Sequence, residues 1–152
     1  MRKGFGLITA IIVLVVVSTL MTLMISLSTT SVKQTTDLYF KEEAELLARS
    51  AVEFGLLAIS GHENNSSCVE HINISYPSSA YPTHEANLTL YYIYDKRQLP
   101  LPTCGASHIL ATNIETNNSN LTTMIDVRVS VRQDITGITE PIVIQRRTIQ
   151  KP

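Results

Sequence analysis

The chain of 152 residues lacks most of the patterns that mark catalytic or nucleotide-binding proteins. It has no tryptophan, two cysteines and six scattered glycines, and no proline precedes Pro77. The glycines form no phosphate-binding loop, and the hydrolase pattern G-x-S-x-G and the metallopeptidase pattern H-E-x-x-H are both missing. We therefore expect no enzyme, no cofactor and no metal site.

Charge is also missing from one long stretch near the N-terminus. Residues 5–32 contain no Asp, Glu, Lys or Arg, and Ile, Val and Leu dominate the part from 5 to 27. As a helix, these 23 residues span roughly 34 Å, which exceeds the hydrocarbon thickness of a bilayer, about 30 Å. We expect a transmembrane helix whose basic start, Arg2 and Lys3, stays in the cytoplasm, so that the rest of the chain lies outside.

A cleaved secretory signal is the alternative interpretation of this stretch. The apolar part of such signals is roughly 7 to 15 residues long and is followed by a small-residue cleavage site. Residues 26–28, Ser-Leu-Ser, imitate such a site, and a secreted chain would then begin near Thr29. The length of the apolar run favours a membrane anchor.

The chain begins with a narrower pattern, in which a short basic leader ends in Gly4 and is followed by Phe5 and the apolar helix. This start resembles that of type IV pilins and of the pseudopilins of type II secretion. The resemblance implies that a prepilin peptidase cuts between Gly4 and Phe5 and methylates the new amino group of Phe5. Because both leader cations are lost, the formal net charge changes from −1 to −1 − 2 = −3. An anchor in which Gly-Phe occurs by accident is the alternative.

One position departs from the family pattern. Most members carry glutamate four residues after the methylated phenylalanine, where this chain has Thr9. A charged side chain inside the bilayer costs about 2.5 to 3.5 kcal/mol on insertion scales and is tolerated when a group of opposite charge pairs with it. Threonine cannot pair with the amine of a neighbouring subunit, so Thr9 favours a minor subunit that starts or caps a filament. Recruitment by apolar packing alone is the other interpretation.

The helix is expected to continue beyond the membrane as an amphipathic segment, residues 28–60. Neither glycine nor proline interrupts it before Phe54, and Gly61 is a typical helix-ending residue. Glu45 and Arg49 are spaced for an ion pair on a solvated face. The apolar stripe that packs on a globular domain is predicted to consist of Phe40, Ala44, Leu47, Ala51, Phe54 and Ala58.

Residues 61–152 are rich in Asn, Ser, Thr and Pro and contain short runs that are typical of strands. Alternation of apolar and polar residues predicts a strand at 125–132 with one buried side. Residues 142–149 are expected to form its hairpin partner after a turn at Gly137. Two further strands are predicted, at residues 88–94 and 108–111. We therefore expect an α+β, pilin-like fold in which the long helix packs on a small antiparallel sheet.

Both cysteines, Cys68 and Cys104, fall on the outer side of the membrane, where oxidising conditions favour a disulfide over free thiols. A bond that closes this loop contributes about 4 kcal/mol in the loop-entropy model. Nearby His62 and His71 form no known zinc pattern with Cys68, and we expect them to be exposed loop residues.

Six asparagines begin the glycosylation acceptor pattern N-x-S/T, mostly in predicted loops. They are Asn64, Asn65, Asn73, Asn87, Asn117 and Asn120. Asn65, Asn87 and Asn117 also have glutamate two residues earlier, which resembles the extended acceptor pattern of bacterial N-glycosylation. We predict glycosylation at these three positions; asparagine as an ordinary loop residue is the alternative.

Some members of the family take up DNA, and four arginines near the C-terminus could share one sheet surface and contact phosphates. They are Arg128, Arg132, Arg146 and Arg147. The negative charge of the mature chain argues against general affinity for nucleic acid.

The resemblance implies a minor pilin or pseudopilin, an assembly subunit of a type IV pilus-like or type II secretion filament in the bacterial inner membrane. Its partners would be other pilin subunits, prepilin peptidase and the inner-membrane assembly platform, and its sheet domain would face the periplasm or the exterior. The expected organisation is a leader at 1–4, a membrane helix at 5–27, its continuation at 28–60 and a β domain at 61–152. A single-pass anchored adaptor or sensor and a DNA-binding competence pilin are the alternatives.

Overall fold

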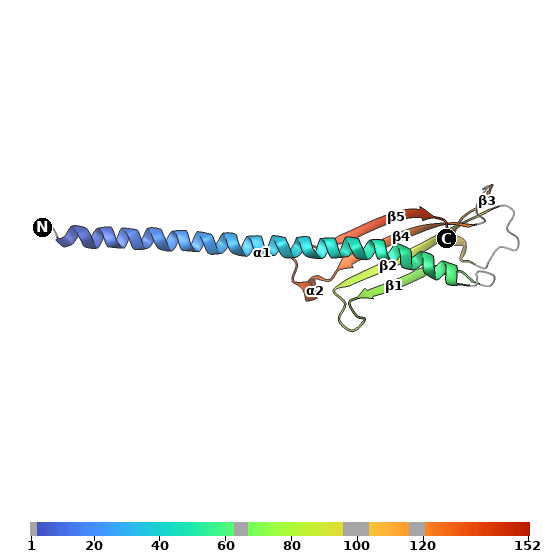
Figure 1. Cartoon of the computed structure of the whole chain (residues 1–152), viewed down its shortest axis with the longest axis horizontal. Coiled ribbons are helices and arrows are strands. Elements are labelled where there is room, and N and C mark those ends of the chain that lie inside the picture. The colour runs from blue at the N-terminus through green and yellow to red at the C-terminus, as the bar shows by residue number, and fades with distance from the viewer. Residues whose placement is uncertain (1–2, 63–66, 96–103, 116–120) are drawn as a thin grey trace. The chain divides into compact units, whose positions relative to one another are not determined.

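A computed structural model describes residues 3–62, 67–95, 104–115 and 121–152 (Figure 1). The chain divides into two compact units, Met1–Leu38 and Tyr39–Pro152, called unit 1 and unit 2 below. The described part of unit 1 is entirely helical, and unit 2 combines the rest of the same helix with a β-sheet.

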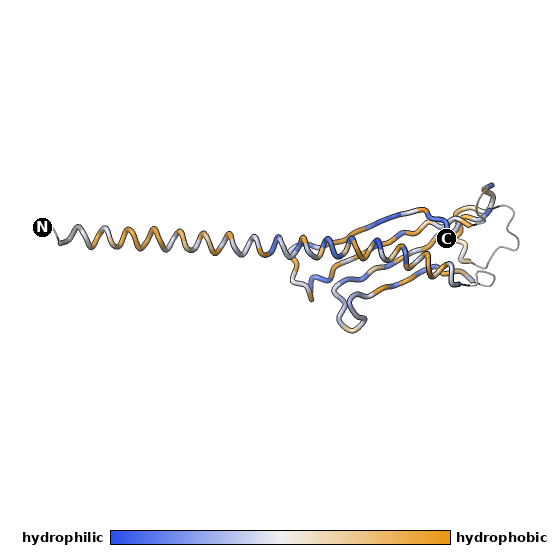
Figure 2. The backbone as a smooth tube through the Cα atoms, in the orientation of Figure 1, coloured by the Kyte–Doolittle hydropathy of each residue, from blue (hydrophilic) through white to orange (hydrophobic). Residues whose placement is uncertain are grey.

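Helix α1, Lys3–Gly61, confirms the predicted long helix and its end at Gly61. Residues 6–35 are all exposed, so in unit 1 the apolar side chains have no protein core around them. Figure 2 shows this apolar character along the first half of the helix. The most apolar 18-residue window has a mean hydropathy of 2.7, which makes α1 long and apolar enough to cross a membrane.

Within the described residues of unit 2 the sheet has five strands, and most of its pairs are antiparallel. The strands are β1 (His71–Tyr76), β2 (His84–Asp95), β3 (Ile109–Ile114), β4 (Leu121–Val131) and β5 (Val143–Gln150). The order is β1-β2-β4-β5, and β3 lies beside the C-terminal part of β2 in parallel orientation. The α+β class, the helix and the β4–β5 hairpin are confirmed, whereas β1 and the parallel placement of β3 are additions to the prediction.

The turn predicted at Gly137 contains a short helix, α2 (Gln133–Thr136), between β4 and β5. Gly137 ends this helix in the left-handed conformation with φ of 66°, which glycine adopts without steric cost. Its backbone N–H donates to the carbonyl of Gln133. Glycine is therefore required at this position for a backbone reason, as the sequence suggested.

The core of unit 2 lies between α1 and one face of the sheet. Alternate residues of β2 and β4 face inward, and they are mostly large and completely buried, for example Leu90, Tyr92 and Val127. The helix contributes mainly small residues, namely Ala44, Ala48, Ala51, Val52, Gly55 and Ile59. A Cβ atom on Gly55 would lie 3.2 Å from Leu88 Cδ2, so the small residues allow the helix to approach the sheet closely.

The predicted apolar stripe of α1 is correct at Ala44 and Ala51 but wrong at Phe54, whose side chain is 50% exposed. Residues seven apart on a straight helix drift by about 20° per heptad, so a stripe that alternates four and three residues leaves the buried face. Ala48 and Ile59, which the prediction omitted, are buried instead. The sequence therefore indicated an apolar face, while the fold determined its direction.

A buried histidine also links the helix to the sheet. His84 of β2 is completely buried, and its Nε2 lies 3.3 Å from the backbone oxygen of Phe40 in α1. Its Nδ1 lies 2.9 Å from Thr83 Oγ1, and Glu43 Oε2 is 3.9 Å from Nε2. Both ring nitrogens thus have polar partners, as burial of a polar side chain requires.

Candidate functional site: the surface of α1 and the disulfide region

The first candidate region is the surface of α1 in unit 1. Its hydroxyl side chains bond within the helix: Ser18 Oγ donates to the Leu14 carbonyl at 2.8 Å, and Thr19 Oγ1 to that of Val16 at 2.8 Å. Such bonds to carbonyls one turn earlier satisfy hydroxyl groups without water. The surface can therefore contact lipid tails or other apolar helices.

The residues of the expected processing site lie at the start of this helix. Gly4 and Phe5 belong to α1, and the side chain of Thr9 is exposed about one turn further along. Arg2, the other leader cation besides Lys3, lies outside the described residues. The predicted cut between Gly4 and Phe5 remains a prediction.

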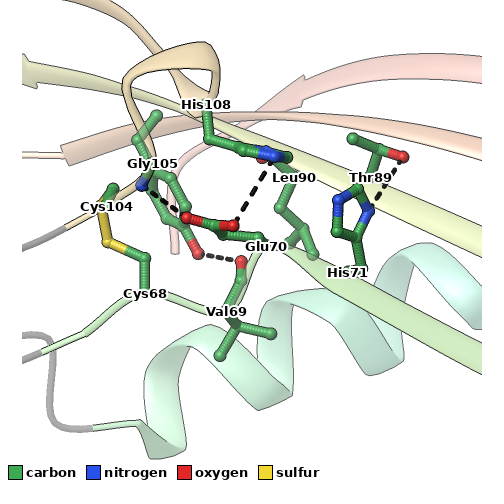
Figure 3. Close-up of polar contacts among 10 residues, drawn as sticks. Cys68, Val69, Glu70, His71, Thr89, Leu90, Cys104, Gly105 and His108 are labelled. Atoms are coloured by element: carbon green, nitrogen blue, oxygen red, sulfur yellow. Dashed lines mark hydrogen bonds and ion pairs between the residues drawn. A yellow bond between two sulfur atoms is a disulfide. The ribbon is translucent and has the colours of Figure 1, made fainter.

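The second candidate region surrounds the disulfide in unit 2, shown in Figure 3. Cys68 and Cys104 are bonded, with their Cα atoms 5.2 Å apart, which confirms the predicted disulfide. Next to it, the backbone N–H of Gly105 donates to Glu70 Oε1. A Cβ atom at Gly105 would lie 2.9 Å from that oxygen, so a larger residue here would make the flexible Glu70 side chain shift.

His108 extends the polar contacts around Glu70. Its Nδ1–H donates to the Leu90 carbonyl at 2.8 Å, and its Nε2 lies 3.7 Å from Glu70 Oε2. The ring also contacts that of His71, with centroids 4.8 Å apart, and stacks on Tyr91. These contacts fasten the segment after Cys104 to β2 (Figure 3).

This cluster contains histidines and a carboxylate, but its geometry is that of a structural fastening. Among the residues that the structure describes, no three His, Cys, Asp or Glu side chains are placed to hold a metal ion. Cys68 is engaged in the disulfide, and His71 lies exposed in β1, where a loop was predicted. His62, with its Nε2 3.2 Å from the Ser67 carbonyl, directly follows the end of α1 and is half-buried rather than exposed as predicted.

The buried phenols of Tyr92 and Tyr94 should make unit 2 sensitive to alkali. Burial raises the pKa of each from 10.0 to about 12, and Tyr92 also donates its hydroxyl to the Val69 carbonyl at 2.6 Å. Folding thus favours the neutral phenols, and this contribution is complete below the unfolded pKa of 10.0 and is lost as the pH rises through about 12. A pH titration followed by near-ultraviolet circular dichroism should show loss of packing in that window.

Single Tyr92→Phe and Tyr94→Phe variants should each lose less stability over the same pH range, although Tyr92→Phe also removes a hydrogen bond at neutral pH. Tyr81→Phe is the matched control, because Tyr81 is 77% exposed. Equal alkaline losses in all three variants and the original chain would contradict the assignment.

The asparagine sites that the structure describes lie in strands, which corrects the loop prediction for them. Asn73 of β1 and Asn87 of β2 are exposed and directly opposite each other in the antiparallel pair. Asn65 and Asn117 lie outside the described residues, as do Asn64 and Asn120. Glycosylation at Asn87 remains a prediction, now on a central strand rather than in a loop.

The four arginines do not form one surface. Arg128 and Arg147 lie on the sheet face away from α1, whereas Arg146 pairs with the inward-facing Val127 and lies on the other face. Arg147 contacts Asp126 through a salt bridge. Arg132 contacts Asp134, and this hydrogen bond holds the pKa of the Asp134 carboxyl below its usual value. Two of the four cations therefore already have carboxylate partners.

A third region was missed at the sequence level: a groove between α1 and β1 in unit 2, with a volume of about 590 Å³. Its lining includes Tyr39, Glu42 and Leu46 of the helix and Tyr76 of β1. The helix spacing of Tyr39 and Leu46, seven residues apart, was the available signal. It could not be used because β1 was not predicted.

The chain was compared with models of protein families, with curated proteins and with solved structures. None of the three comparisons finds a match.

Proposed function

We propose that the chain is a minor pilin or pseudopilin, an assembly subunit of a type IV pilus-like or type II secretion filament. The observation that carries the proposal is helix α1, which contains Gly4-Phe5 in its first turn, exposes apolar side chains throughout residues 6–27, and continues as the helix that packs on the sheet. A pilin needs these three features in this order. The absence of a glycine-rich phosphate loop in the sequence means that energy for extraction from the membrane comes from a separate motor.

The physical argument concerns where the apolar surface goes. In the bilayer, lipid tails cover the side chains of unit 1, but outside the membrane the same surface must be covered by other apolar helices. Large apolar residues also remain exposed on α1 within unit 2, where no lipid is expected: Leu46 at 63%, Phe54 at 50% and Leu57 at 68%. Packing of several α1 helices against one another covers the apolar side chains of unit 1 and also these exposed residues of unit 2.

Thr9 supports a minor rather than a bulk subunit. It stands at the position where most family members carry glutamate, and the chain therefore lacks the carboxylate that pairs with the amine of a neighbouring subunit. A subunit that begins or caps a filament does not need this pair. The sheet domain would then face the periplasm or the exterior.

The mass of the mature N-terminal peptide tests the proposal. We expect a chain that begins at N-methylated Phe5 and has lost Met1 to Gly4, because prepilin peptidase recognises the leader and cuts after the glycine. A strain without prepilin peptidase is the control and should yield the uncut chain. An anchored adaptor would keep Arg2 in both strains, and a secreted protein would begin near Thr29; either result would contradict the proposal.

A further inference from the structure

Strand β1 forms one border of the sheet, and its outer edge has no strand partner among the described residues (Figure 1). In an antiparallel pair, successive residues point their backbone N–H and C=O groups alternately toward the partner strand and away from it. The carbonyl of Glu70 accepts from the N–H of Leu90 in β2, so the backbone groups of residues 72 and 74 also face β2. Those of His71, Asn73 and Ser75 therefore face the open edge.

The strand at the other border, β5, carries charges that protect its edge, whereas β1 does not. Arg146 and Arg147 are exposed in β5, and Lys151 directly follows this strand. Charged side chains and proline on an edge strand are common devices that prevent a further strand from pairing. Strand β1 contains no Asp, Glu, Lys, Arg or Pro. Of the two borders, β1 is therefore the one that can accept a further strand.

The groove between α1 and β1 lies where an added strand would place half of its side chains. Residues 72, 74 and 76 of β1 point to the sheet face that α1 covers, because their partners in β2 are buried. Tyr76, together with Tyr39 and Leu47 of α1, gives the groove of about 590 Å³ its apolar walls. A strand added to β1 would lie about 4.8 Å further out, so its inward side chains would enter this groove.

Two carboxylates make the groove selective. Glu42 and Glu43 of α1 also line it. Glu42 is exposed, and Glu43 Oε2 lies 3.9 Å from Nε2 of the buried His84. Carboxylates beside apolar walls attract Lys or Arg, whose aliphatic stem contacts the walls while the charge meets the carboxylate. The inward side chains of an occupant should therefore be apolar and include one cation.

We propose that β1 binds an extended segment of a different protein, which adds a strand to the sheet and places apolar side chains and one Lys or Arg in the groove. In this mode of recognition, main-chain hydrogen bonds supply affinity, and pockets for alternate side chains supply specificity. Unit 2 offers both parts, the open backbone groups of His71, Asn73 and Ser75 and the acidic groove beside them. The charges of β5 disfavour it as the added strand, so the occupant is not a second copy of the chain.

A synthetic peptide of sequence Thr-Val-Thr-Lys-Thr-Val-Thr tests this mode of binding on the full-length chain in detergent. Fluorescence anisotropy of the labelled peptide should show saturable binding. Replacing its lysine with glutamate should weaken binding about tenfold, because the groove is acidic. Absence of saturable binding, or equal binding of the two peptides, would overturn the proposal.

N-methylated forms of the same peptide test the backbone contact without altering the protein. Residues that lie opposite each other share a face of the sheet, so with valine and lysine in the groove the threonines lie opposite His71, Asn73 and Ser75. N-methylation of the threonines removes the N–H groups that face β1 and should weaken binding at least about tenfold. N-methylation of the valines, whose N–H groups face away, should leave binding unchanged. Equal losses for the two forms would overturn the proposal.

Proline substitutions test the edge from the side of the protein. Asn73→Pro removes an N–H that faces outward and spares the bonds to β2, so peptide binding should fall at least about tenfold. Gln145→Pro is the matched control: the Ile142 carbonyl faces β4, where it accepts from Val131 N–H, so by alternation the N–H of Gln145 faces outward from β5. Equal losses in the two variants would overturn the proposal. If circular dichroism shows that Asn73→Pro is unfolded, the methylated peptides decide.

A charge exchange tests the groove. Glu42→Lys should weaken binding of the lysine peptide about tenfold and restore binding of the glutamate peptide. Glu53→Lys is the matched control, because Glu53 is exposed on α1 but does not line the groove. Equal effects of the two substitutions would overturn the proposal. So would oligomers of the peptide-free chain that Asn73→Pro dissociates, because a second copy would then occupy the edge.

This inference concerns unit 2 alone and does not depend on the proposed function. Because the added strand belongs to a different protein, the contact does not repeat from copy to copy, which is compatible with a subunit that begins or caps a filament. If the peptide does not bind while the mature chain begins at N-methylated Phe5, the inference is wrong and the pilin proposal stands. If the leader is retained while the peptide binds, the pilin proposal fails and the inference stands.

Discussion

Replacing Cys68 and Cys104 together with alanine is expected to lower the free energy of unfolding of unit 2 by about 4 kcal/mol. The two residues are 36 apart in sequence, and the cross-link removes conformational entropy from the unfolded chain. Small domains have a total stability of about 5 to 15 kcal/mol, so this loss is a large fraction of it. Denaturant unfolding of the full chain in detergent, followed by near-ultraviolet circular dichroism, measures the change.

Reduction of the original chain provides the control for this prediction. A thiol reagent should shift the unfolding midpoint of the original chain to that of the double-alanine variant and leave the variant itself unchanged. If the variant instead unfolds at the midpoint of the untreated original, the contacts from Glu70 to Gly105 and His108 hold this segment without the disulfide.

Leu90→Ala is expected to destabilise unit 2 by about 2 to 5 kcal/mol. Leu90 lies in the central strand β2, is completely buried, and is among the side chains nearest to Gly55 of α1. Truncation removes its contacts with the helix and leaves a cavity that the flanking strands β1 and β4 prevent from collapsing. The same denaturant measurement applies.

Leu57→Ala makes the same chemical change on the other side of the helix and serves as the matched control. Leu57 is 68% exposed, and its truncation should alter stability by less than about 0.5 kcal/mol. Equal losses for the two variants would mean that the core does not lie between α1 and the inner face of β2.

The long helix could be predicted because it depends on local sequence. The absence of charge over residues 5–32 and the absence of proline before Pro77 required a long helix, and Gly61 marked its end. The alternation over residues 125–132 predicted β4 and its buried side for the same local reason. The disulfide could be predicted from the expected compartment and from the presence of only two cysteines.

The candidate sites were less predictable. Strand β1 has three polar residues, His71, Asn73 and Ser75, in alternation with apolar ones, but it was missed because it is short and follows a stretch rich in turn formers. Without β1, neither the groove at Tyr76 nor the pairing of Asn73 with Asn87 could be foreseen. The contacts of Glu70 with Gly105 and His108 join segments far apart in the sequence, and no motif marks them.

The sequence by itself determined that α1 is one long helix with an apolar first half and that alternating strands follow it, because backbone preference and hydrophobic periodicity are local properties. Only the tertiary structure decided which face of α1 is buried, that β3 runs parallel to β2, and that Arg146 and Arg147 lie on opposite faces. Each of these depends on the rotational position of a helix or the register of a strand. A shift of one residue changes the face on which a side chain lies while leaving the local pattern intact.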